Sequence, residues 1–224
     1  MRTIARFIAL AAIAMCVPAV HAQTVDNETT EPMSIDAAFE ACSAMQEAVE
    51  RNDTAALARA ASRLKLENVK PFSQMRCKDE NIESLDGHFV FNEEFVDSLA
   101  AGKDAFANAD KINSSSTKRG RTTDGKIFSK SCLVKADGKT VYTFPSRGRQ
   151  ELGVIAEAGG RVAVRIHVTN RKGLNEWHND NKNAVNGARR YRTAFSLPDD
   201  TVNTVTLEVI NKSPKDISFV VIGN

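Results

Sequence analysis

The stretch that most constrains the fold is Arg149–Asn170, which predicts two β-strands joined at Ala158-Gly159-Gly160. Two consecutive glycines supply the positive φ angles that a tight hairpin turn requires. In the second arm, four β-branched residues alternate with smaller or polar ones: Val162, Val164, Ile166 and Val168. Alternation of this kind is typical of a strand with one buried face and one face in water.

Further β-strands are expected throughout the C-terminal half of the chain. The candidates are residues 127–135, 139–144, 149–158, 161–169, 189–196, 202–211 and 216–223. Turn-forming residues such as Asp137-Gly138 and Ser213-Pro214 separate them. Seven short strands with almost no helical pattern predict an antiparallel β-sandwich of jelly-roll-like type. Its last strand is apolar on both sides, which predicts a central position in a sheet.

The N-terminal half has a helical pattern instead. An apolar stripe begins after Ser34, a natural N-cap, and recurs every three or four residues: Ile35, Phe39, Cys42, Met45 and Val49. Asn52 and Asp53 interrupt the stripe and can cap a second helix, and Asn92 can cap a third that Gly102 ends. The chain is therefore expected to be α+β, with a small helical domain followed by the sandwich.

The expected organisation has five parts. Residues 1–22 read as a signal peptide with a basic start, an apolar core and small residues before a cut after Ala22, which predicts a periplasmic or secreted protein. The remaining 202 residues divide into a flexible leader, an acidic helical domain, a linker and a basic sandwich: 23–33, 34–112, 113–126 and 127–224. No later segment is apolar for long enough to predict a transmembrane helix.

Charge is distributed unevenly between the two halves. Residues 23–110 hold 18 acids and 8 bases, a net −10, whereas residues 111–224 hold 10 acids and 20 bases, a net +10. Parts of opposite sign either dock on each other or offer the basic part to an anionic partner. A nucleic-acid partner is not expected, because no recognition motif accompanies the charge.

Three cysteines remain in the mature chain, in a compartment where disulfides persist. We expect Cys42 to pair with Cys77, because closing a loop of that length would stabilise the fold by roughly 3 kcal/mol. Cys132 is then expected to be buried and inert.

One family resemblance rests on a short series of residues. Tyr142-Thr143-Phe144, Gly148, Leu152, Val154 and Gly159 resemble the opening of the pre-peptidase C-terminal family of secreted β-sandwiches. The resemblance implies an accessory role in binding or secretion, sometimes with calcium. The chain departs from that family in having no peptidase upstream and a long excursion after Thr169.

That excursion, residues 170–188, is the first candidate site. It contains Trp177, the only tryptophan, followed by His178, Asn179 and Asp180. An exposed indole can stack on a sugar ring while the polar side chains bind its hydroxyls, or the oxygens, Asp180 among them, can contribute to a Ca²⁺ site. The alternative is that Trp177 folds back onto the sandwich and the asparagines satisfy the loop backbone.

A basic strand face is the second candidate. Arg165 and His167 share one side of a predicted strand, and Arg190 and Arg192 share one side of another. If these strands were adjacent, the four side chains would face an anionic surface polymer or a partner domain, whereas the alternative is a solvated surface.

No catalytic motif is present: the chain lacks His-Glu-x-x-His, Gly-x-Ser-x-Gly, P-loop and Gly-x-Gly-x-x-Gly sequences. We therefore expect a non-catalytic binding or accessory protein that recognises a glycan or an anionic surface ligand through its sandwich. The alternative is a secreted hydrolase with a site between the two domains.

Overall fold

The computed structural model describes residues 35–63, 69–78, 84–109, 127–180 and 187–224, which belong to one compact unit spanning 32–224. The helices are α1 (Ile35–Glu50), α2 (Thr54–Arg63), α3 (Glu93–Ala100) and the short 3-10 helix η2 (Phe106–Asn108). The strands are β1 (Val69–Pro71), β2 (Arg76–Cys77), β3 (Ile127–Val134), β4 (Lys139–Ser146), β5 (Gly148–Ala156), β6 (Val162–Thr169), β7 (Asn175–Asp180), β8 (Arg190–Leu197), β9 (Asn203–Asn211) and β10 (Ile217–Gly223).

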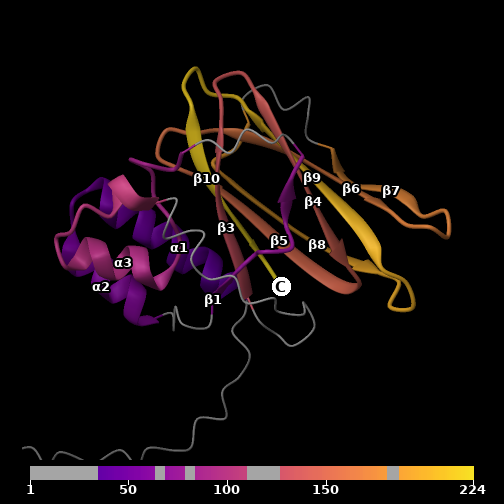
Figure 1. Ribbon diagram of the computed structural model, residues 1–224, viewed down its shortest axis with the longest axis horizontal. Coiled ribbons are helices and arrows are strands. Elements are labelled where there is room, and N and C mark those ends of the chain that lie inside the picture. Colours follow the sequence, from indigo (N-terminus) through magenta and orange to yellow (C-terminus); the bar gives the residue numbers. More distant parts are fainter. Residues whose placement is uncertain (1–34, 64–68, 79–83, 110–126, 181–186) are drawn as a thin grey trace, which may run out of the picture. The chain divides into compact units, whose positions relative to one another are not determined.

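The strands form two five-stranded sheets (Figure 1). Sheet A has the order β1-β3-β10-β5-β8, and sheet B has the order β2-β4-β9-β6-β7. From β3 onward the chain alternates between the sheets except at β6 and β7, which gives the strand order of a jelly roll. The expectation of an α+β chain with an antiparallel, jelly-roll-like sandwich is confirmed, and all seven predicted strands are present.

The predicted hairpin between the arms of 149–170 is wrong. β5 pairs with β10 and β8 in sheet A, whereas β6 pairs with β9 and β7 in sheet B. The turn at Gly159, with φ +69°, instead carries the chain from one sheet to the other. Because a corner between sheets and a hairpin both use positive φ, the glycines alone do not distinguish the two.

Three strands were not predicted. β1 and β2 span only three and two residues, and they lie at sheet edges, where β1 runs parallel to β3 and β2 antiparallel to β4. β7 has the sequence NEWHND, which has no apolar alternation. It lies at the edge of sheet B, within residues 170–188, where the sequence predicts no helix or strand.

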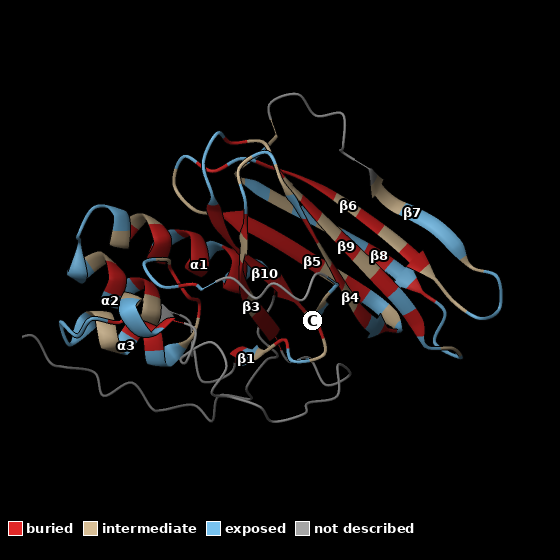
Figure 2. Cartoon of the chain, turned by 45° about the horizontal axis from the view of Figure 1, so that its top comes forward, coloured by how far each residue is buried: buried red, intermediate tan, exposed pale blue. Residues whose placement is uncertain are grey.

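Two apolar clusters lie on opposite sides of sheet A. One fills the space between the sheets and includes Leu152, Leu207 and Phe219. The other joins the helices to the outer face of sheet A and includes Phe39, Phe95 and Val220. All seven residues of β10 are buried, which confirms its predicted central position (Figure 2).

The helix ends follow the predicted capping residues. The side chain of Asp53 accepts a hydrogen bond from the Ala56 amide at 2.8 Å, and that of Asn92 accepts one from the Phe95 amide at 2.8 Å. These contacts satisfy amides that the first turn of a helix leaves without partners. Gly102 has φ +67° just beyond α3. The predicted cap Ser34 lies outside the described residues, as do the predicted signal peptide, leader and linker.

The predicted disulfide between Cys42 and Cys77 is wrong, because both are free thiols. Cys42 lies in the cluster beneath the helices, whereas Cys77 lies between the sheets, 3.5 Å from the Thr140 hydroxyl. Sheet A separates the two thiols, and loop length carries no information about which side of a sheet each residue occupies. Cys132 is buried as expected, and burial raises the pKa of its thiol to about 12.

Ion pairs add to the contact between α1 and sheet A. They join Arg189 to Glu50, Arg190 to Glu47 and Arg192 to Asp36. Partly exposed pairs of this kind contribute at most about 1 kcal/mol each. The apolar cluster therefore supplies most of the attachment, and the charges orient the helix. Among the described residues, no helix is long and apolar enough to cross a membrane.

Helix α1 packs tightly against sheet A at Gly153. A Cβ atom at this position would lie 2.5 Å from the ring of Phe39. We expect Gly153→Ala to lower the free energy of unfolding by about 1–3 kcal/mol, because either the ring or the helix must move. Urea unfolding tests this, and Phe39→Ala provides the background in which the cost should disappear. Equal stability of Gly153→Ala and the wild type would contradict the close packing.

A second link between the helical part and the sandwich contains Glu157. Its Oε2 lies 3.1 Å from His88 Nδ1 and accepts a hydrogen bond from the Ser218 hydroxyl at 2.9 Å. Burial of the carboxyl raises its pKa, but the hydrogen bonds from His88 and Ser218 outweigh burial and hold the pKa of Glu157 below its ordinary value. The folded state therefore binds this proton less readily than the unfolded chain.

Glu157 should consequently make the stability depend on acid pH. Because its folded pKa is lowered, its contribution is complete above about pH 5 and is lost as the pH falls below about 4. We expect Glu157→Gln to flatten this part of the curve of urea midpoint against pH. Asp97→Asn, which removes an exposed carboxylate from α3, is the control. Parallel curves for the wild type and Glu157→Gln would contradict the expectation.

Candidate functional site

The outer face of sheet B is the sheet surface on which polar side chains gather. Every second residue of β4, β6 and β9 points away from the buried cluster, as strand geometry requires. The register places one row of side chains across all five strands: Trp177, His167, Thr206, Thr143 and Arg76. The row begins at the edge strand β7 and ends at the edge strand β2.

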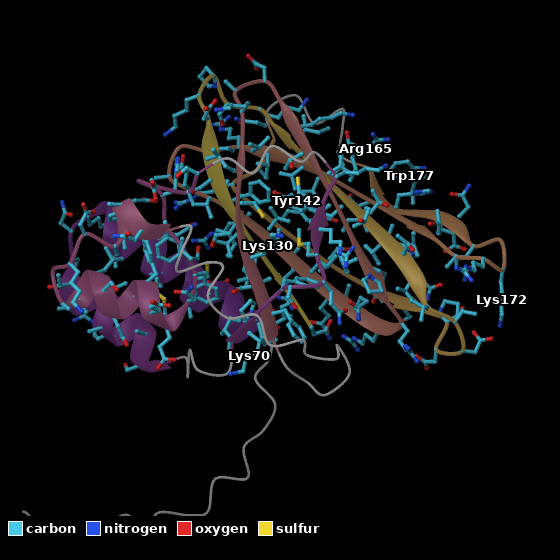
Figure 3. The ribbon with its side chains drawn as sticks, in the orientation of Figure 1. Lys70, Lys130, Tyr142, Arg165, Lys172 and Trp177 are labelled. Atoms are coloured by element: carbon cyan, nitrogen blue, oxygen red, sulfur yellow. The ribbon has the colours of Figure 1, made fainter. Side chains whose placement is uncertain are left out.

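Trp177 is the prominent side chain of this face, with 52% of its surface exposed. The guanidinium carbon of Arg165 lies 4.4 Å from the centroid of its ring, and the His167 ring lies 4.6 Å away at an angle of 36°. Arg165 and His167 project from the same face of β6, so they support the indole from the strand side. Figure 3 labels Arg165 and Trp177, which lie next to each other. The arrangement leaves indole surface open to solvent.

A bulge in β7 determines which way its side chains point. Ile166 pairs with Asn179 and His167 with Trp177, so His178 is the extra residue. The His178 ring turns inward and stacks on the Phe195 ring, with 4.6 Å between the ring centroids. The side-chain amide of Asn179 donates a hydrogen bond to the Val164 carbonyl. The predicted group Trp177 to Asp180 is therefore divided, because Trp177 lies on the outer face whereas the side chains of His178 and Asn179 turn away from it. Asp180 is described only by its strand position opposite Arg165.

Next to Trp177, a carboxylate and two cations form a rigid group. Glu208 is only 13% exposed, and its two oxygens contact Arg165 at 2.8 Å and Lys139 at 3.0 Å. Arg165 is 18% exposed, so its position between Glu208 and the indole is well determined by contacts on both sides. A guanidinium held between a carboxylate and an aromatic ring combines a charge-assisted hydrogen bond with a cation–π contact.

The face continues toward the loops at one end of the sandwich. His167 Nε2 lies 2.5 Å from the side-chain oxygen of Asn175. Asn175 also lines a hollow of about 440 Å³ between the β6–β7 and β8–β9 loops, together with Asn170 and Thr201. Asn170 holds these loops together, since its side chain bonds the amides of Lys172 and Leu174 and the Asn203 oxygen.

Arg190 and Arg192 do not share this face. They lie on β8 in sheet A, whereas Arg165 and His167 lie on β6 in sheet B. Arg190 and Arg192 are ion-paired with the acidic residues of α1. The four cations of the second candidate site are therefore two separate pairs.

The possible Ca²⁺ site and the hydrolase alternative are not tested by the structure. In the part of the chain that the structure describes, no group of three or more His, Cys, Asp or Glu residues could hold a metal ion. The proposed Ca²⁺ site at Asp180 adjoins residues outside that part. Where the helices meet sheet A, the described contacts include the apolar cluster, the ion pairs and the hydrogen bonds that link Glu157 to His88 and Ser218.

Comparison with protein-family models and with curated proteins finds no match, and the resemblance to the pre-peptidase C-terminal family stays a prediction. Solved structures with some likeness include TmCBM61 in complex with beta-1,4-galactotriose, with a TM-score of 0.30 and 9% identity over 42% of this chain and 68% of that one. Another is the CBM22-1 xylan-binding domain from Paenibacillus barcinonensis Xyn10C, with a TM-score of 0.24 and 10% identity over 47% of this chain and 83% of that one. Likenesses of this size say nothing about function.

The sequence pattern did not identify several residues of the outer face of sheet B. Thr143, Thr206 and Glu208 belong to predicted strands, and alternation places each on the polar side. Only the pairing of β4, β9 and β6 brings them into one surface. Pairing between strands so distant in sequence leaves no local signal.

Trp177 offers a direct spectroscopic test because the chain has one tryptophan. We expect red-shifted emission and ready quenching by acrylamide in the folded protein, since half of the indole surface is exposed. Arg165→Ala should increase the quenching constant further by uncovering the supported side of the ring. Lys172→Ala, in the neighbouring loop, is the control. Blue-shifted emission that acrylamide does not quench would show that the indole is buried.

Proposed function

We propose that the protein is an exported, non-catalytic glycan-binding protein that holds its ligand on the outer face of sheet B. The observation that carries the proposal is the exposed indole of Trp177, which is supported by Arg165 and His167 and stands at the end of a row of polar side chains. The signal peptide predicted at residues 1–22 agrees with a ligand outside the cytoplasm.

The chemistry of a sugar ring suits this arrangement. One side of a pyranose presents C–H groups that pack against an aromatic face, and its edge presents hydroxyls that need hydrogen-bond partners. Trp177 provides the aromatic surface, while Thr143 and Thr206 provide hydroxyls on the same row. Asn175 adds an amide beside His167. These groups both donate and accept hydrogen bonds, as sugar hydroxyls do.

Pre-organisation favours binding at this position. The indole already contacts Arg165 and His167, and Arg165 is fixed by Glu208. A ring that is ordered before binding loses little further conformational freedom when the ligand arrives. The outer face of sheet A, by contrast, is covered by the helices, so sheet B is the sheet on which an extended ligand can lie.

The proposal predicts that Trp177→Ala abolishes most of the glycan binding detected on an array. Loss of the main aromatic contact of a binding site typically costs at least about 2 kcal/mol, which corresponds to roughly a 30-fold weaker Kd. Glycans that the array identifies would be measured by isothermal titration with the wild type and the variant. Trp177→Phe should retain part of the affinity because it keeps an aromatic face.

Val202→Ala is the matched control. Val202 is 54% exposed in the β8–β9 loop and is the other large hydrophobic residue with comparable exposure among the described residues. Its replacement should leave glycan binding and the urea midpoint unchanged. Binding that Trp177→Ala leaves intact, or the absence of any glycan ligand, would contradict the proposed function.

A further inference from the structure

The cations on the two sheets have different surroundings. Those at the start of β8, on sheet A, are paired with Asp36, Glu47 and Glu50 of α1. Within the described part of the chain, Arg76 and Lys78 at the β2 edge of sheet B are exposed and make no ion pair. The acidic helix thus neutralises one basic surface of the sandwich and leaves the other available to an external anion.

Arg76 and Lys78 lie on the same face as Trp177. Arg76 pairs with Thr143 and so continues the row that starts at the indole. Lys78 follows two residues later, and its amide bonds the Val141 carbonyl, which places it on the same side. Four strand spacings separate β7 from β2, a distance of about 19 Å. A short oligosaccharide lying across the strands would reach both edges.

The same face carries a positive balance among the side chains that the structure describes. Arg76, Lys78, Lys139 and Arg165 are cationic, Glu208 is the carboxylate that faces them, and Asp180 holds the register position opposite Arg165 at the β7 edge. Both oxygens of Glu208 are occupied by Arg165 and Lys139. Glu208 is therefore unavailable to repel an anionic ligand or to pair with the cations at β2.

We infer that this face selects glycans that carry carboxylates, such as polyuronates, with the sugar chain running across the strands from Trp177 to Arg76 and Lys78. The inference rests on the proposed glycan-binding function and adds the charge of the ligand and its direction. Trp177 packs against one sugar ring, the threonines of the central strands bind hydroxyls, and the two β2 cations bind a carboxylate. A guanidinium suits this last role because its paired N–H groups match the two oxygens.

A nucleic acid would present a similar charge but fits the surface less well. Proteins that bind single strands without sequence preference stack successive bases on several aromatic side chains. On the described part of this face Trp177 is the exposed aromatic residue, and Thr206 and Thr143 follow it in the row. Hydroxyl groups spaced along the strands suit a polyhydroxylated chain better than a series of stacked bases.

The test compares oligogalacturonates with neutral galactan oligosaccharides of equal length, from disaccharide to hexasaccharide. The wild type should bind the uronate series more tightly, with affinity that rises with length and falls with salt. Arg76→Gln combined with Lys78→Gln should weaken binding of the uronate hexasaccharide about tenfold and leave the disaccharide and the neutral series unchanged. Both residues are exposed, and the urea midpoint verifies that the variant is folded.

Arg59→Gln combined with Lys103→Gln is the matched control, since it removes two exposed positive charges from the helical part. This variant should bind the uronate hexasaccharide like the wild type.

Equal effects of the two double variants, or equal affinity for charged and neutral chains, would overturn the inference. Glycan binding that depends on Trp177 would still support the proposed function in that case. Loss of Trp177 dependence would overturn both. Tighter binding of oligothymidylate through Arg76 and Lys78 would overturn the inference in favour of a nucleic acid.

Discussion

The fold depends on strand β10, which buries apolar side chains on both of its faces. One face meets the opposite sheet through Phe219 and Val221, and the other meets the helices through Val220 and Ile222. Burial of a large aliphatic or aromatic side chain contributes about 1.5–3 kcal/mol. A sandwich standing alone would leave the outward half of β10 in water, so the helices are required as a second layer on sheet A.

Because of this layer, the outer faces of the two sheets have different surroundings. The helical layer brings its acids to the arginines of β8, and the contact occupies the outer side of sheet A. Sheet B has no such layer among the described residues, and its outer strands carry polar and cationic side chains around Trp177. The opposite charges of the two halves are therefore partly paired within the molecule, between α1 and the start of β8.

The sequence predicted local structure well and long-range pairing poorly. Alternation over two residues identified the seven main strands, and Asn92 and Asp53 marked helix starts, because these signals lie within a few residues of each other. The sequence predicts a hairpin at Gly159 because the partner strands that decide between a hairpin and a corner lie 35 to 71 residues away. β7 was missed because its sequence is polar throughout.

The same distinction applies to the candidate site. Arg165 and His167 were correctly placed on one strand face, since period-two alternation determines it. The sequence did not reveal that Arg190 and Arg192 face an acidic helix, because that contact spans more than 140 residues. The exposure of Trp177 was left open in the sequence and depends on the extra residue in β7, which turns His178 inward and the indole outward. A bulge of one residue has no signature in a polar segment.

The edge strands β1 and β2 precede the sandwich in the chain but complete its sheets. β1 covers the free edge of β3, and β2 covers that of β4. Exposed strand edges invite pairing with other chains, so short covering strands protect against aggregation. A recombinant fragment that began at β3 would expose two sheet edges and the apolar side of β10 together. The sandwich is thus not an interchangeable module that could be fused to a new neighbour, and it would have to be inherited with the helices before it.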